Sequence, residues 1–188
     1  MSAVRGLEHV VTRLSDSCGQ GHSGSLLEAP SADVLSCSMQ AVVYYGVPGD
    51  ITDVLPRIGE AGIAVWGPQD GEGRDMPHAR GTVSYALTYH RDHGRYPDGS
   101  LMSTPVLEAA GMRVDWDRPG MPMPSRFEGF VHSCDPDGGH PVYERCSTAP
   151  KEPMSMAAAR DQYGTVLTFS LGEPGSSAYQ YFTVPRRQ

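Results

Sequence analysis

The clearest pattern in the chain is the alternation of apolar and polar residues between positions 82 and 90. Val83, Tyr85, Leu87 and Tyr89 occupy one set of alternate positions, and polar or small residues occupy the other. A period of two is typical of a strand that buries one face, so this pattern predicts a strand over residues 82–90. Short apolar runs between glycines and prolines predict the remaining strands. They cover residues 34–45, 62–66, 100–106, 112–116, 127–132, 142–145, 165–171 and 178–184.

One segment near the N-terminus has a helical period instead. Val4, Leu7, Val11 and Leu14 are three or four positions apart, which predicts an amphipathic helix over residues 3–16. The serine- and glycine-rich stretch that follows predicts a flexible loop up to residue 33. We therefore divide the chain into residues 1–33, a helix with its loop, and residues 34–188, a β domain.

The number and spacing of the strands predict an all-β fold. Eight or nine short strands favour an antiparallel barrel of about eight strands, in which 165–171 and 178–184 form the closing hairpin. One helical turn is expected over residues 157–161. Since a closed barrel has no strand edge to cover, we expect the N-terminal helix to cap one mouth of the barrel as a lid. A contact in a homodimer is its alternative role.

The composition restricts the class of protein. The 188 residues suit a single domain, and 22 glycines with 16 prolines favour short strands over long helices. A net charge of −7 argues against nucleic-acid binding. No apolar stretch approaches the ~20 residues of a membrane helix, and the first 16 residues contain no apolar segment of a secretory signal. We therefore expect a cytoplasmic protein without a membrane partner.

The cysteines give little indication of a metal or redox site. Cys18, Cys37, Cys134 and Cys146 form no C-x-x-C pair, so neither a structural zinc site nor a thioredoxin-type motif is indicated. A reducing cytoplasm predicts free thiols. A disulfide between Cys134 and Cys146 is the alternative if the protein is exported.

Three short motifs in the middle of the chain point to a known family. Gly49-Asp50-Ile51 is followed by Gly59 and by the run Ala61-Gly62-Ile63-Ala64-Val65. After the predicted strand 82–90, the chain continues to Arg126-Phe127-Glu128-Gly129-Phe130. In type and spacing these motifs, over residues 49–132, resemble the barrel of the plant allene oxide cyclases, which has a Phe-Glu-Gly turn into a late strand.

This resemblance implies both a fold and an activity. Allene-oxide-cyclase-like and dirigent proteins are calycin-like, eight-stranded antiparallel barrels with an apolar cavity. Bacterial proteins of similar shape include the spirotetronate cyclases, which fold polyene intermediates for an intramolecular 4+2 cycloaddition. The resemblance therefore implies a cofactor-free cyclase, an isomerase of natural-product biosynthesis, that acts on a hydrophobic intermediate derived from a polyketide.

In such a barrel, aromatic residues of the strands would line the cavity. Tyr85 and Tyr89 share a face of the predicted strand and offer hydroxyl groups as catalytic residues. Glu128, if it faces inward, would orient a substrate carbonyl or hydroxyl in its protonated form, although an outward, solvated side chain is its alternative. The residues expected to bind substrate are Tyr44, Trp66, Trp116, Phe127 and Tyr181. Ordinary core packing is the alternative role for all these aromatic residues.

Two other functions remain open at this point. A barrel with the same pocket would bind a hydrophobic small molecule without turning it over. Alternatively, His90, His93, His132 and His140 would supply ligands for a metal-dependent enzyme.

Overall fold

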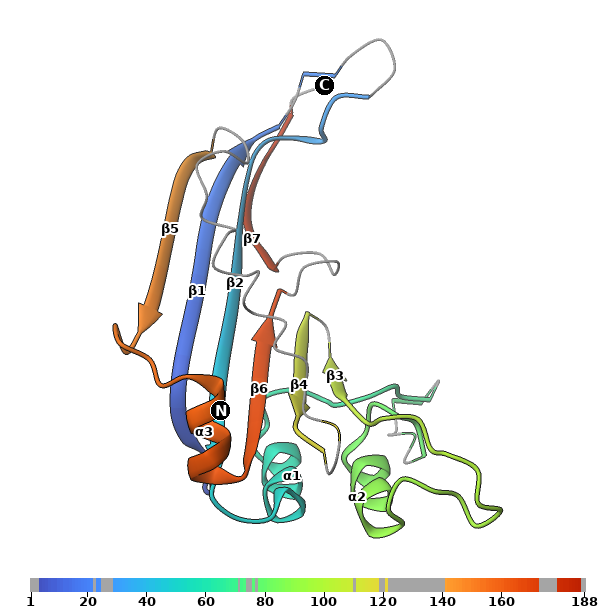
Figure 1. The fold of residues 1–188 in the computed structure, drawn as a ribbon. Coiled ribbons are helices and arrows are strands. Elements are labelled where there is room, and N and C mark those ends of the chain that lie inside the picture. Colours follow the sequence, from blue (N-terminus) through green and yellow to red (C-terminus); the bar gives the residue numbers. More distant parts are fainter. Residues whose placement is uncertain are drawn as a thin grey trace.

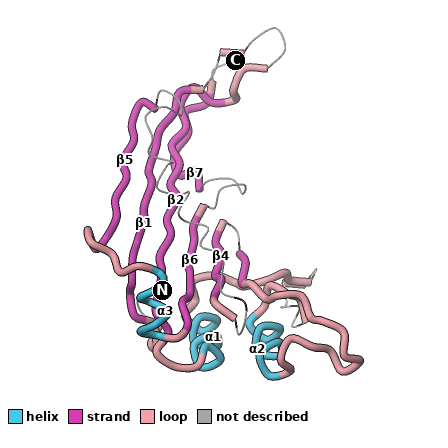
Figure 2. Tube along the Cα trace, viewed as in Figure 1, coloured by secondary structure: helices cyan, strands magenta, loops and turns pink. Residues whose placement is uncertain are grey.

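A computed structural model of the chain describes residues 4–21, 23–24, 29–70, 72–73, 76, 78–109, 111–118, 121, 141–172 and 179–186. These residues form a seven-stranded antiparallel sheet and three helices (Figure 1, Figure 2). The strands are β1 (Glu8–Gln20), β2 (Asp33–Val47), β3 (Leu107–Ala109), β4 (Met112–Trp116), β5 (Pro141–Ala149), β6 (Thr165–Leu171) and β7 (Tyr179–Pro185). The helices are α1 (Ile51–Glu60), α2 (Val83–Arg91) and α3 (Met156–Tyr163).

The sheet is open. Its strand order is β3-β4-β6-β2-β1-β5, and β7 also pairs with β2. β6 lies against residues 41–47 of β2 and β7 against residues 33–39, so these two strands follow one another along the same edge of β2. The predicted hairpin between them is therefore wrong. The antiparallel β architecture is confirmed, but the described sheet does not close into a barrel. Between β2 and β3 the chain forms α1 and α2, and none of the strands predicted at 62–66, 82–90 and 100–106 is found.

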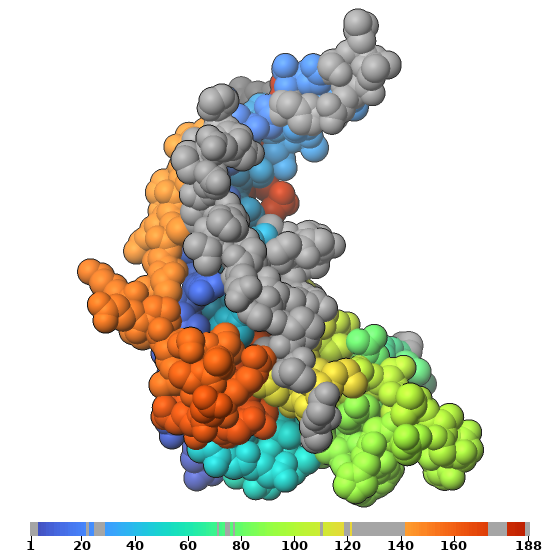
Figure 3. Space-filling view, in the orientation of Figure 1, coloured from blue at the N-terminus to red at the C-terminus, as the bar shows by residue number. Residues whose placement is uncertain are grey.

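Helices cover both faces of one end of the sheet, which we call the helix-covered end (Figure 1). The space-filling view shows α3 and the chain of α1 and α2 gathered at this end (Figure 3). On one face, α1 and α2 pack against Tyr45, Trp116 and Leu167, which stand opposite one another in register and therefore share that face. On the other face, α3 packs against Tyr44 and Val166. The side chains of both clusters are almost completely buried.

The other end of the sheet, the distal end, consists of β5, β7, residues 14–20 of β1 and residues 33–41 of β2. Within the described residues, no helix packs on it (Figure 1). Most of its side chains on β1 and β2 are only half-buried. Its exposed large apolar residues are Val34, Val142, Tyr143, Tyr181 and Phe182.

The predicted N-terminal helix is wrong, because residues 8–20 form β1. This strand pairs with β2 over nearly its whole length and with β5 on its other side. Val10 and Val11 are buried, and with Thr12 they form a β-branched run that favours a strand. The lid required a helix on a flexible tether, so its basis is lost.

The predicted strand over residues 82–90 is also wrong, since Val83–Arg91 is the helix α2. Thr82 caps it: the Thr82 hydroxyl accepts a hydrogen bond from the backbone N–H of Tyr85 at 3.2 Å. The neighbouring residues Tyr85 and Ala86 are both buried. In a strand, neighbours point to opposite faces, whereas a helix at the surface of a core buries such pairs.

The other predicted elements have mixed outcomes. Strands are confirmed at β2, β4, β6 and β7, and the extended segment at 142–145 is confirmed as the longer β5. The helical turn expected at 157–161 is confirmed and extends over all of α3. No strand is found at 62–66 or 100–106. The strand predicted at 127–132 lies outside the described residues.

The cysteines of the described part are oxidised. Cys18 of β1 and Cys37 of β2 stand directly opposite one another and form a disulfide. Cys146 is also disulfide-bonded. The expectation of free thiols is therefore wrong for these three residues, and Cys134 lies outside the described residues. No helix among the described residues has the length and apolar character needed to cross a membrane.

Candidate functional site

A groove of about 980 Å³ opens at the helix-covered end. Its walls are the first turn of α1, the second half of α2, the two residues after β4 and the start of β6. The charged and imidazole side chains in its lining are Asp50, His90, Arg91, His93, Asp117 and Arg118. Polar residues thus come together from four segments that are far apart in the sequence.

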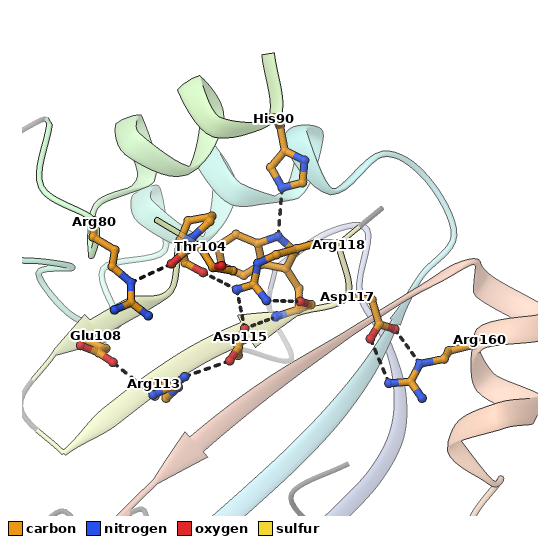
Figure 4. Close-up of polar contacts among 11 residues, drawn as sticks. Arg80, His90, Thr104, Glu108, Arg113, Asp115, Asp117, Arg118 and Arg160 are labelled. Carbon is orange, nitrogen blue, oxygen red and sulfur yellow. Dashed lines mark hydrogen bonds and ion pairs between the residues drawn. The ribbon is translucent and has the colours of Figure 1, made fainter. Parts of the chain in front are cut away.

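Trp116 holds His90 in one tautomer. The indole Nε1–H of Trp116 donates a hydrogen bond to Nε2 of His90 at 3.0 Å, and the two rings are stacked (Figure 4). An indole nitrogen can only donate, so Nε2 has to be the unprotonated nitrogen of the imidazole. The proton of the neutral ring is therefore on Nδ1, the nitrogen that does not contact Trp116.

The surroundings keep His90 neutral. Burial lowers the pKa of His90; Asp50 opposes this shift, and the charge of Arg118 adds to it. A proton on Nε2 would also point at the indole N–H, which disfavours the charged ring. At neutral pH, His90 is thus a hydrogen-bond donor through Nδ1–H and has no free lone pair with which to act as a base.

Asp50 lies at the rim of the groove and caps α1. Its Oδ1 accepts hydrogen bonds from the backbone N–H and the hydroxyl of Thr52, both at 2.8 Å. These bonds lower the pKa of Asp50, so it is a carboxylate at neutral pH. Asp50 and His90 affect each other's pKa, yet no hydrogen bond or ion pair joins them. The second carboxylate oxygen of Asp50 has no partner within the described chain.

Two ion pairs fix the floor of the groove. The guanidinium of Arg118 donates to Asp115 at 2.6 Å, to the carbonyl of Trp116 at 3.0 Å and to the carbonyl of Pro105, and it lies 5.0 Å above the Trp116 ring (Figure 4). Asp117 accepts two hydrogen bonds from Arg160 and one from the backbone N–H of Val166. Because Arg118 stacks on the same indole that bonds His90, the position of His90 depends on this network.

One donor of the network has no acceptor among the described residues. The Nε–H of Arg118 is buried, and only 6% of this side chain is exposed. Unpaired buried donors are rare in folded proteins.

The structure does not gather the aromatic residues that the sequence suggested for a cavity. Tyr85 is buried on α2 with its hydroxyl donating to the carbonyl of Ser103 at 2.8 Å, and Tyr89 follows one turn later. Tyr44 is buried under α3, on the opposite face of the sheet from Trp116. Trp66 packs beside α1 and α2, while Tyr181 is exposed on β7. Phe127 and Glu128 lie outside the described residues.

The histidines suggested for a metal site are divided in the same way. His90 and His93 both line the groove, whereas His132 and His140 lie outside the described residues. Among the residues that the structure describes, no cluster of three or more histidine, cysteine or acidic side chains is arranged to hold a metal ion.

Sequence reasoning missed Asp50 and Arg118 as site residues. A signal for Asp50 existed: it precedes Ile51, Val54, Leu55 and Ile58, which have a helical period, and aspartate is a preferred N-cap. No sequence motif indicated Arg118, which bonds Asp115 and the carbonyl of Trp116 in β4 and the carbonyl of Pro105.

Comparison with protein-family models, with curated proteins and with solved structures yields no match. The resemblance to the allene oxide cyclases accordingly stays a prediction.

Proposed function

We propose that this protein binds a small polar molecule in the groove and that His90 orients it. The single observation that carries this proposal is the hydrogen bond from Trp116 to His90. This bond directs the remaining imidazole proton, on Nδ1, away from the indole. A ligand carbonyl, hydroxyl or carboxylate oxygen would accept it.

The rest of the groove supports binding more than catalysis. A general base needs a free lone pair and a pKa near the working pH. His90 offers neither, because Nε2 is occupied by Trp116 and burial lowers its pKa. The pKa of Asp50 is also lowered, which makes this carboxylate a weak base but a good acceptor. A donor on α2 and an acceptor at the start of α1 suit recognition of a ligand that carries both kinds of group.

The sequence left open non-catalytic binding of a hydrophobic small molecule in a barrel cavity. This proposal keeps non-catalytic binding, but the ligand is polar and the site is a surface groove. The cofactor-free cyclase stays a prediction; it would need an enclosed apolar cavity in addition to this groove. A homodimer also stays a prediction.

The proposal is tested in two steps. First, nitrogen-15 NMR of the imidazole rings should find the proton of His90 on Nδ1 at neutral pH. Second, saturation-transfer NMR against small amides, amines, alcohols and carboxylates should identify binders, and their signals should weaken in His90→Leu.

The matched control is His78→Leu, because His78 is an exposed histidine that does not line the groove. This variant should bind like the wild type, and thermal denaturation should show that both variants fold. If no compound binds, or if folded His90→Leu binds every compound as well as the wild type does, the groove is not the site.

A further inference from the structure

The described charged side chains of the groove are paired with one exception. Arg118 is paired with Asp115, Asp117 with Arg160, and Arg91 with Asp92, whose pKa the neighbouring His93 also lowers. His90 is neutral at neutral pH, because burial lowers its pKa. Asp50 has no oppositely charged partner among the described residues, and its second oxygen accepts no hydrogen bond from them. The described charges of the groove therefore leave one negative charge, at its rim.

From this arrangement we infer that the ligand is a cation that also has a hydrogen-bond acceptor, such as a protonated amine or a guanidinium compound with an amide or carbonyl group. The cationic group lies against Asp50 at the rim, and the acceptor receives the proton on Nδ1 of His90. This inference rests on the proposed function and specifies the class of ligand for the same groove.

Asp50 and His90 line the same groove, and no hydrogen bond or ion pair joins them. Oδ2 of Asp50 accepts no hydrogen bond from the described residues, and Trp116 bonds Nε2 of His90 rather than Nδ1, so each residue keeps a polar atom for a third group. The groove of about 980 Å³ is large enough for a drug-sized molecule.

A zwitterion or an anion is less suitable, because no described cation of the groove is unpaired. Arg91 is the most accessible one, but its bond to Asp92 at 2.8 Å would have to open. An anion at the rim would also be repelled by Asp50. The preference for a positively charged ligand thus depends on Asp50 alone, so a substitution of this residue tests it.

The experiment compares three probes that have the same length and the same terminal amide. They are 6-aminohexanamide, which is cationic, heptanamide, which is neutral, and adipic acid monoamide, which is anionic. Dissociation constants are measured by ligand-observed NMR titration in low salt. We expect the cationic probe to bind about threefold to tenfold more tightly than the neutral one, and the anionic probe to bind most weakly.

Asp50→Asn should remove this preference. Asparagine is as good an N-cap as aspartate, so α1 stays capped while the charge is lost. The matched control is Asp53→Asn, which makes the same change in the same helical turn at a residue that does not line the groove. The preference for the cationic probe should persist in Asp53→Asn. In the wild type, this preference should weaken at high salt, because Asp50 is exposed.

The outcomes separate this inference from the proposed function. If the neutral or anionic probe binds as tightly as the cationic one and His90→Leu weakens binding, the groove is a site but the charge preference is wrong. The charge preference is equally wrong if Asp50→Asn and Asp53→Asn have equal effects. If none of the probes binds at millimolar concentration, or if His90→Leu leaves binding unchanged, both the inference and the proposed function are overturned.

Discussion

The two ends of the sheet share strands β1 and β2 but are stabilised in different ways. At the helix-covered end, Val42, Trp116 and Leu167 have at most 1% of their surface exposed, and helices lie on both faces. At the distal end, Tyr143, Tyr181 and Phe182 are 44–49% exposed. The distal end therefore depends more on its backbone ladder and on covalent links than on a core.

At the distal end, a disulfide cross-links the strands where a buried core would otherwise stabilise them. Tyr143 of β5, Cys18 of β1, Cys37 of β2 and Phe182 of β7 stand opposite one another in one row across four strands. Cys37 is eight residues from Tyr45 along β2, so this row continues the face on which α1 and α2 pack further along the sheet. Two half-exposed aromatic residues thus flank a cross-link on a sheet face that no described helix covers.

The largest effect is expected from opening a cavity at the helix-covered end. Leu167→Ala should lower the free energy of unfolding by about 2–5 kcal/mol, because Leu167 is completely buried between β4, β2 and α1. Chemical denaturation measures the change. Phe182→Ala at the distal end is the comparison and should cost much less; equal costs would mean that the distal end has a core of its own.

Removing the cross-link is the next largest change. Cys18→Ser combined with Cys37→Ser should lower the free energy of unfolding by about 3 kcal/mol, since the bond closes a loop with a sequence separation of 19. The double variant is preferable to a reducing agent, because Cys146 is disulfide-bonded as well. Hydrogen exchange should speed up most in residues 14–20 and 33–41. Faster exchange confined to β4 and β6 would contradict the division into two ends.

A third prediction concerns the ion pair that joins α3 to the sheet. Asp117 accepts hydrogen bonds from Arg160 and from the N–H of the buried residue Val166, so Asp117→Ala leaves this N–H without an acceptor. A loss of about 1–3 kcal/mol in unfolding free energy is expected. Asp92→Ala removes the partner of the exposed Arg91, a surface ion pair, and should leave stability unchanged within error. Similar losses in both variants would show that burial does not matter here.

The sequence predicts a strand correctly where an apolar run is also rich in residues that favour strands and has glycine or proline near its end. The apolar cluster before Gly46 predicted β2, and the runs at 112–116 and 165–171 predicted β4 and β6. These segments are rich in β-branched and aromatic residues, and glycine or proline ends them nearby. The short helix α3 was also expected, because alanine favours helices.

The errors arose where one pattern fits two structures. The alternation over residues 82–90 fits a strand, whereas the hydroxyl of Thr82, which caps α2, favours a helix. Four apolar residues near the N-terminus fitted a helix, but pairing with β2, distant in sequence, makes residues 8–20 a strand. Whether such a segment forms a helix or a strand depends on the segment against which it pairs or packs, and a single sequence does not show that segment.

The candidate site was less predictable than the fold. Trp116 and His90 were both singled out, one as a cavity wall and the other as a metal ligand, yet their function here comes from the bond between them. They are 26 residues apart, on a strand and a helix that meet only in the folded chain. A single sequence gives no signal for such a contact.

The smallest effect, and the one most specific to the groove, is a pH dependence due to His90. Its folded-state pKa is lowered from the ordinary value of 6.5 by burial. Between these two pKa values the unfolded chain binds a proton that the folded chain does not, so this residue's contribution to stability is complete above pH 6.5 and is lost as the pH falls toward the folded-state pKa. Trp116→Phe removes the indole donor and should raise the pKa of His90, which reduces this loss. NMR titration of the imidazole in both proteins measures the shift directly. An unchanged pKa in Trp116→Phe would mean that burial alone keeps His90 neutral, and that the hydrogen bond from the indole does not contribute.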